Sequence, residues 1–188
     1  MKKIILLSFF VLFFHEIVNC QLRKSAEDIK EKIKDMAFFA GSWRAETVFY
    51  TRKDHVPEYR ETGIYKISWV LDTTYLKWDI QLHDKNNSGR KRSILILITF
   101  NPDSSYYEEN YFYNGSSLKV FEIGNYDKIH RDFTTKAFIP LEDGSHDEHV
   151  RTVTHIMAKN SISYIHYSQY SNEPEECNDF SAFLERVK

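Results

Sequence analysis

Apolar and polar side chains alternate along most of the chain after Gly41, with the period of two that is typical of strands with one buried face. In residues 76–82 the apolar side chains share one face: Leu76, Trp78, Ile80 and Leu82. Residues 180–187 alternate in the same way. No long segment with helical spacing interrupts these strands, which excludes a parallel βαβ architecture. The pattern predicts an all-β domain.

Turn-forming residues separate the alternating segments at short intervals. We expect breaks at residues 55–57, 72–73, 86–89, 101–103, 114–115, 124–125, 143–144, 159–160 and 172–174. Asn114-Gly115 and Asp143-Gly144 favour type I′ hairpin turns, because both residues adopt positive φ there. These breaks define about ten strands with hairpin-length loops. Such an antiparallel meander must close into a barrel or form two packed sheets to protect its edges.

A short helix is predicted before the first strand. Ser25 is a suitable N-cap in front of an acidic first turn. One apolar stripe then follows at helical spacing: Ile29, Ile33 and Met36 or Ala37. The helix is expected to end near Phe39, before Gly41.

The first twenty residues have the layout of a secretory signal peptide. Lys2 and Lys3 precede an apolar run from Ile4 to Phe14. That run is shorter than the roughly 20 apolar residues that span a bilayer. We therefore expect export to the periplasm or the exterior, with residues 1–20 removed and residues 21–188 forming a single domain.

Cys20 leaves open whether the exported protein is soluble, lipid-anchored or disulfide-bonded. Cleavage after Cys20 would leave Cys177 as a lone thiol. Residues 17–20 loosely resemble a bacterial lipobox, so Cys20 could instead carry a lipid, which is the one membrane contact we expect. A Cys20–Cys177 disulfide is the third possibility.

The charge balance argues against nucleic acid as the main partner. Loss of Lys2, Lys3 and Glu16 changes the formal net charge from −2 to −3. The only basic block in the remaining chain, residues 90–92 (Arg-Lys-Arg), follows Asn87-Ser88-Gly89 and is interpreted as a solvated hairpin tip.

Phe39-Ala40-Gly41-Ser42-Trp43 places a Gly-x-Trp motif at the start of the first strand, directly after the helix. This arrangement resembles the calycin superfamily, which includes lipocalins, fatty-acid-binding proteins and bacterial relatives. The resemblance implies a barrel in which Trp43 closes one end and a basic residue of the last strand packs across its ring. Arg186 stands where that residue is expected, and a guanidinium can stack on an indole while it donates to nearby carbonyls. We therefore expect a roughly ten-stranded antiparallel barrel with the helix capping that end.

The likeness is closer to a family of exported bacterial lipocalin-like domains without an assigned function. That family shares the helix, the Gly-x-Trp motif, and an Asn-Pro-Asp before a Tyr-rich strand, here residues 101–103 and 106–111. Haem-binding nitrobindin-like barrels continue Gly-x-Trp with glycines, where this chain has residues 44–46 (Arg-Ala-Glu). Their proximal histidine would have to be His155 or His166, and we expect no cofactor. The second motif of secreted lipocalins, similar to Thr-Asp-Tyr, is absent from the sequence.

The Tyr-rich segment 106–113 is the main candidate for a ligand-binding wall. One face carries Tyr107, Glu109, Tyr111 and Tyr113, and the other carries Tyr106, Glu108, Asn110 and Phe112. The sequence leaves open which face points inward. Tyrosine suits amphipathic pockets, because its ring is apolar and its hydroxyl is polar. We expect a small hydrophobic or amphipathic ligand in the barrel, bound by Tyr107, Tyr111, Tyr113 and Trp78; the alternative is that these residues only fill the core.

Residues 142–149 hold the densest group of possible metal ligands, including His146 and His149. Residues around a hairpin tip rarely preset a coordination sphere, so we expect a solvated turn and no metal site.

No motif for nucleophilic or metal catalysis is present, and we assign no catalytic residue. Cys177 lies among acidic residues, which disfavour its thiolate. Glu108 or Glu109 could still support acid–base chemistry inside a barrel, with Tyr111 and Arg131 as partners. That non-metal enzyme is one alternative to a binding protein, and a structural or interaction module without a pocket is another.

Overall fold

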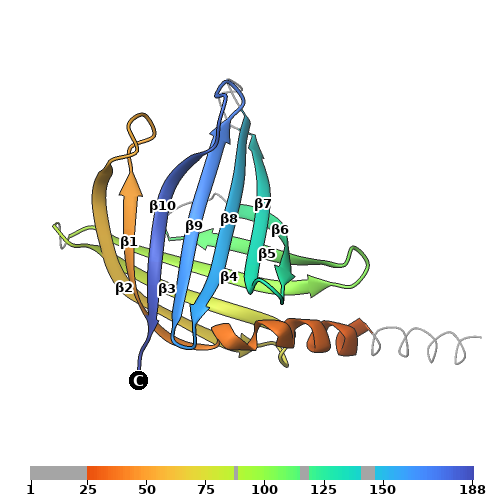
Figure 1. Ribbon diagram of the computed structural model, residues 1–188. Helices are drawn as coiled ribbons and strands as arrows, with labels where there is room; N and C mark the ends of the chain where they lie inside the picture. The colour runs from red at the N-terminus through yellow and green to blue at the C-terminus, as the bar shows by residue number, and fades with distance from the viewer. Residues whose placement is uncertain (1–24, 87–88, 115–118, 141–146) are drawn as a thin grey trace, which may run out of the picture.

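The structure, a computed structural model, describes residues 25–86, 89–114, 119–140 and 147–188 (Figure 1). Ten antiparallel strands form a closed barrel, and a short helical segment lies across one end. The strands are β1 (Gly41–Tyr50), β2 (Pro57–Val70), β3 (Tyr75–Asp84), β4 (Lys91–Asn101), β5 (Tyr106–Tyr113), β6 (Lys119–Asp127), β7 (Asp132–Pro140), β8 (Asp147–Ala158), β9 (Ser161–Tyr170) and β10 (Cys177–Arg186). The expected all-β, ten-stranded antiparallel barrel with an N-terminal helix is confirmed.

The barrel is a simple meander in which each strand pairs with its neighbours in sequence. The pairing of β1 with β10 closes the sheet and sets Trp43 opposite Arg186. Closure leaves no unpaired sheet edge. Alternate residues of each strand point inward, and in β1 these are Trp43, Ala45, Thr47 and Phe49.

The helical segment covers the end of the barrel at which β1 begins. It is α-helical over residues 25–33 and continues as the 3-10 helix η1 (Lys34–Phe39), so it ends at the predicted residue. Ser25 is itself helical and is not a cap that precedes the helix. Ile33, Met36 and Phe39 are buried in the barrel core. In the described part of the chain, no helix has both the length and the apolar character needed to cross a membrane.

Most predicted breaks coincide with connections between strands. Those at residues 55–57, 72–73, 101–103, 159–160 and 172–174 fall in or beside such connections, as do residues 86 and 89 of the break at 86–89, of which 87 and 88 lie outside the described residues. The break at 114–115 begins at Asn114, which directly follows β5. Gly115, Asp143 and Gly144 lie outside the described residues, so the type I′ turns stay predictions.

The break predicted at Gly124-Asn125 is wrong, because both residues lie inside β6. Gly124 is buried between β5 and β7, where a Cβ atom would lie 2.3 Å from the carbonyl oxygen of Thr134. This glycine therefore permits a close approach of two strands and makes no turn. The real connection is residues 128–131, where Asp127 accepts backbone N–H bonds from Ile129 and His130.

The two ends of the barrel carry different connections. The end under the helix, which we call the helix end, also holds residues 71–74, 102–105, 128–131 and 159–160. The opposite end, which we call the far end, holds residues 51–56 and 171–176, the ends of β3, β5 and β7 and the start of β4. In Figure 1 the helix runs along the bottom and the loops after β1 and β9 stand at the top.

Candidate functional site

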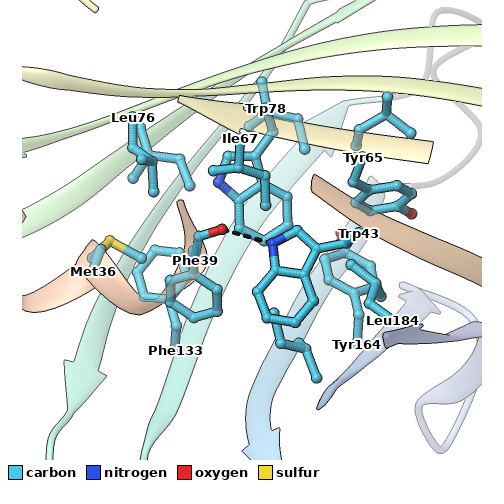
Figure 2. Packing of buried hydrophobic residues seen from close by; sticks show 14 of the residues in the cluster. Met36, Phe39, Trp43, Tyr65, Ile67, Leu76, Trp78, Phe133, Tyr164 and Leu184 are labelled. Carbon is cyan, nitrogen blue, oxygen red and sulfur yellow. Dashed lines mark hydrogen bonds between the residues drawn. The ribbon is translucent and has the colours of Figure 1, made fainter. Parts of the chain in front are cut away.

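Trp43 and Arg186 meet at the helix end. The guanidinium carbon of Arg186 lies 4.1 Å from the centre of the Trp43 ring. Arg186 donates to the carbonyls of Ala40 and Phe38 at 2.7 and 2.5 Å. The Trp43 indole donates to the carbonyl of Phe39 at 2.7 Å, the dashed line in Figure 2. These bonds join the last strand to the end of the helix, so this end of the barrel is closed.

Gly41 is required by that contact. Its φ is +137°, and a Cβ atom there would lie 2.5 Å from Nη1 of Arg186. Any side chain at this position would displace the guanidinium and strain the backbone. The glycine of the Gly-x-Trp motif thus makes room for the arginine that covers the tryptophan.

Two of the predicted ligand-binding residues lie in the packed core near this end. Trp78 packs on Phe39, with ring centroids 5.6 Å apart (Figure 2). Tyr107 donates its hydroxyl to the carbonyl of Lys32 at 2.9 Å and packs edge-on against Phe133. Burial raises the pKa of Tyr107. Neither Trp78 nor Tyr107 lines the cavity described next.

The interior toward the far end contains a cavity of about 110 Å³. Five aromatic residues, four aliphatic residues and four further polar residues line it: Tyr65, Tyr111, Tyr113, Tyr164 and Phe180; Ile80, Leu82, Ile94 and Ile96; Thr47, Arg92, Glu122 and His166. Tyr111 and Tyr113 are thus brought to a common cavity, and the face of β5 that carries them points inward. Burial raises the pKa of Tyr113 and of Tyr65 to about 12, so both phenols stay neutral and can donate hydrogen bonds.

A pair of buried carboxyl groups lies beside this cavity, and one of the two, Glu122, lines it. Glu109 of β5 and Glu122 of β6 are directly opposite each other in the sheet, and they are 4% and 2% exposed. Tyr111 donates to Glu109 at 2.8 Å, and Glu122 accepts from Thr152 at 3.2 Å and from Thr135. Across residues 25–188, gaps aside, no basic side chain forms an ion pair with either glutamate.

Burial and mutual repulsion disfavour ionisation of the two carboxyl groups. Burial, with the repulsion of Glu122, raises the pKa of Glu109, and burial also raises the pKa of Glu122. Two adjacent carboxylates in a low-dielectric interior do not both ionise readily. Ionisation of one carboxyl therefore makes ionisation of the other less favourable, and the pair holds on to a proton to a higher pH than two solvated glutamates would.

Arg92 enters the cavity from β4 and forms an ion pair with Glu61 of β2. Its guanidinium lies 4.8 Å from the centre of the Phe49 ring. The prediction of a solvated tip at residues 90–92 is therefore wrong for Arg92. The strand already begins at Lys91, and its alternation turns Arg92 inward, where the buried carboxylate of Glu61 neutralises it.

His166 also faces the cavity. Its ring stacks on Phe180 with centroids 4.7 Å apart, and its Nε2 lies 3.8 Å from a carboxylate oxygen of Asp179. Burial lowers the pKa of His166, so its imidazole is neutral at pH 7. His155, the other histidine considered as an iron ligand, is exposed on the outer surface and bonds to Asp132.

Two buried polar atoms of cavity-lining residues have no hydrogen-bond partner within the part of the chain that the structure describes: the hydroxyl of Thr47 and Nε of Arg92. Thr47 is 1% exposed, and its hydroxyl has no hydrogen-bond partner among the described residues. It is near enough to Tyr65 to offset slightly the rise that burial causes in the pKa of that phenol, but the two do not meet in hydrogen-bonding geometry. A buried hydroxyl without a partner is costly, so it needs a physical explanation.

The acid–base group suggested by the sequence is not assembled. Glu108 lies on the outer face of β5 and accepts from Asn101 at 2.6 Å. Arg131 is exposed in the connection at the helix end, with its guanidinium 5.6 Å from the Phe38 ring. Only Glu109 and Tyr111 of that group are joined.

Arg52 ties together the connections at the far end. It forms ion pairs with Glu173 and Asp179 and lies 4.1 Å above the Tyr170 ring. The thiol of Cys177 is near the carbonyl of Arg52, at 3.8 Å, and Cys177 is the free cysteine of the described residues. Cys20 lies outside them, so its predicted forms stay open.

Of the suggested metal cluster, His146 and its neighbours 142–145 lie outside the described residues. His149 is exposed on β8. Within the part of the chain that the structure describes, no group of three His, Cys, Asp or Glu side chains is arranged to hold a metal ion.

Sequence reasoning missed Arg92, Glu122 and His166 as cavity residues. The signal for Arg92 is present, because it is in phase with the buried Ile96 and Ile98 of β4. The signal for Glu122 is misleading. In β6 the apolar Phe121 and Ile123 are 50% and 43% exposed, while the glutamate between them is buried.

No protein-family model matches the chain, and no curated protein matches it in sequence. The closed ten-stranded antiparallel barrel is consistent with the calycin-like fold that the Gly-x-Trp resemblance implies.

Proposed function

We propose that this protein binds one small, compact molecule inside the far half of its barrel. The observation that carries the proposal is the cavity of about 110 Å³, which combines aromatic and aliphatic walls with a few buried polar groups. Ligand sites in proteins have this composition, since apolar walls supply affinity and a few polar groups supply orientation. A module without a pocket would instead have a filled interior.

The size of the cavity restricts the ligand. Drug-sized ligands occupy pockets of about 300–1,000 Å³, and an apolar cavity of about 150 Å³ holds benzene. A volume of about 110 Å³ therefore suits a single small ring or a short branched chain. A long-chain fatty acid would not fit, because the layer around Trp43 and Trp78 blocks the rest of the barrel.

Native mass spectrometry and NMR titration with cyclopentanol, phenol and palmitate would test this proposal. We expect the two ring compounds to bind and palmitate not to bind. Ile94→Trp should weaken binding at least about ten-fold by filling the cavity. Leu95→Trp is the matched control, because Leu95 lies on the outer face of the same strand. Equal binding by both variants, or no binding of either ring compound, would overturn the proposal.

Acid–base catalysis is a second candidate, favoured by one observation. Glu109 is a buried carboxyl with a raised pKa and a tyrosine hydroxyl bonded to it, and such groups are common at active sites. A catalytic role requires Glu109→Gln to abolish turnover of a bound molecule while leaving its affinity unchanged. Binding without turnover in the wild type would reject it.

We also propose that the protein acts after export. The support is the basic head at Lys2 and Lys3 followed by the apolar run to Phe14. The intact mass of the protein recovered outside the cytoplasm would test the idea. A mass that begins at Gln21 indicates a soluble form, a lipid-modified mass that begins at Cys20 indicates an anchored form, and a full-length mass contradicts cleavage.

A further inference from the structure

We infer that the cavity is selective for a small organic cation, a protonated amine on a compact apolar body. This inference rests on the proposed function and specifies its ligand class. It is carried by three features that converge on one space: the Glu109–Glu122 pair without a basic partner, an aromatic wall, and the unsatisfied hydroxyl of Thr47.

The charged groups at the cavity leave a negative excess. Arg92 is the only cation that lines it among the described residues, and the carboxylate of Glu61 neutralises that guanidinium. His166 is buried against Phe180 and is neutral. No basic side chain of the described residues is placed to compensate whichever carboxyl of the glutamate pair is ionised. Buried charges are normally paired, so an ammonium group is the complementary ligand.

The aromatic side chains that line the cavity also favour a positively charged ligand. Tyr111 and Tyr113 stack with centroids 6.4 Å apart, and Tyr164 and Phe180 stack with centroids 5.8 Å apart. With Tyr65, these rings line one cavity. Aromatic faces attract cations through their quadrupoles, more strongly where water is excluded. The same rings give no comparable attraction to a carboxylate.

Thr47 supplies a hydrogen-bond acceptor that nothing in the described protein uses. Its hydroxyl is buried, faces the cavity and has no partner. An ammonium group has three donors and needs several acceptors when it is buried. Thr47 and Glu122 both line the cavity and can each accept one of them.

Two features favour an anion instead: the buried Nε of Arg92, which also lacks a partner, and the neutral phenols of Tyr65 and Tyr113, which can donate hydrogen bonds. The ion pair with Glu61 already compensates the charge of this guanidinium, so an anion would meet an uncompensated carboxylate and no free positive charge. The balance of charge therefore favours the cation.

The test uses three probes on nearly the same five-membered ring: cyclopentylamine, cyclopentanol and cyclopentanecarboxylate. At pH 7 they are a cation, a neutral molecule and an anion. NMR titration of the purified protein gives their dissociation constants. We expect the amine to bind at least about ten-fold more tightly than the alcohol, and the carboxylate to bind most weakly.

Glu122→Gln removes the charge and keeps the shape. We expect this variant to lose the preference for the amine while cyclopentanol binds within about two-fold of the wild type. Glu108→Gln is the matched control, because Glu108 is the same residue type on the outer face of the neighbouring strand. Thermal unfolding monitored by circular dichroism checks that each variant is folded. If Glu122→Gln does not fold, the comparison of the three probes on the wild type still tests the inference.

The outcomes separate this inference from the proposed function. Equal binding of alcohol and amine, or stronger binding of the carboxylate, overturns the cation inference and leaves a small-molecule site in place. Retention of amine preference in Glu122→Gln also overturns it. Binding of none of the three probes overturns both.

Discussion

The two halves of the barrel are built in opposite ways. At the helix end, Arg186 and Trp43 donate to the carbonyls that end the helix, and aromatic side chains fill the space between them. In the far half, two carboxyl groups and a partnerless hydroxyl are buried beside a cavity that a half-buried arginine also lines. The first arrangement stabilises the closed sheet. The second costs stability, so we attribute it to ligand binding.

The strongest challenge to this contrast is Trp43→Ala. We expect the free energy of unfolding to fall by about 4 kcal/mol, because the substitution empties the centre of the packed end. Urea unfolding followed by circular dichroism measures the change. Phe183→Ala, on an outward-facing position of β10 that is 43% exposed, should cost less than about 1 kcal/mol. Similar losses in both variants would show that the helix end is not the main source of stability.

The pH dependence of stability probes the other half. The pKa of Glu109 rises from the ordinary 4.5 to about 8 on folding. The folded state therefore binds its proton more tightly than the unfolded state does. The associated stability is complete below pH 4.5, is lost as the pH rises toward 8, and changes no further above that.

Between pH 5 and pH 8 we expect the wild type to lose on the order of 3 kcal/mol more than Glu109→Gln loses. Urea unfolding at several pH values measures this difference. Glu108→Gln, on the outer face of the same strand, should follow the wild type. Parallel curves for the wild type and Glu109→Gln would mean that the carboxyl pair is not held in the shared-proton state.

Gly124→Ala tests the close approach of β6 and β7 beside Tyr107, two residues along β6 from Glu122. The added methyl group would lie 2.3 Å from a backbone oxygen, and we expect a loss of about 2 kcal/mol from overpacking. Thermal unfolding measures it. Ala158→Gly is the control, because it removes a methyl group at an exposed position of β8. It should change stability by about 1 kcal/mol or less. A neutral Gly124→Ala would show that β6 and β7 can separate without cost.

Thr47→Val should have the smallest effect on stability and the opposite sign. Replacing a partnerless buried hydroxyl with a methyl group of the same shape is expected to leave stability unchanged or raise it by about 1 kcal/mol. Binding of cyclopentylamine should weaken in the same variant. Thr62→Val, on the outer face of β2, serves as the control. A clear loss of stability in Thr47→Val would mean that the hydroxyl is already satisfied within the protein.

The sequence predicts the sheet well because its signals are local. Hairpin residues and alternation mark nearly every strand, and Gly41, Trp43 and Arg186 are recognised by their spacing from the helix and from the final strand. The cavity is harder to predict, because its composition depends on which face of each strand points inward. In β6 the usual rule is reversed, since Phe121 and Ile123 point outward and Glu122 is buried.

Tertiary neighbours decide such cases. Arg92 resembles the tip of a basic hairpin until Glu61, 31 residues earlier, is placed beside it. Gly124 resembles a turn until its neighbours Tyr107 and Thr135 are known. Tyr107 and Tyr111 share a face of one strand, but only Tyr111 reaches the cavity, since the helix covers the other. Spacing along the chain contains none of this information.

The bond between Arg186 and Ala40 joins residues 146 positions apart, and it has a consequence for how the protein folds. Nine hairpins can form between strands that are neighbours in sequence, whereas the pairing of β1 with β10 can form only after all of them. Until then the incomplete sheet has two unpaired edge strands, which can pair with other chains. Crowded or rapidly synthesised molecules should therefore be lost to aggregates at this step, and a slower supply of chains should rescue the yield.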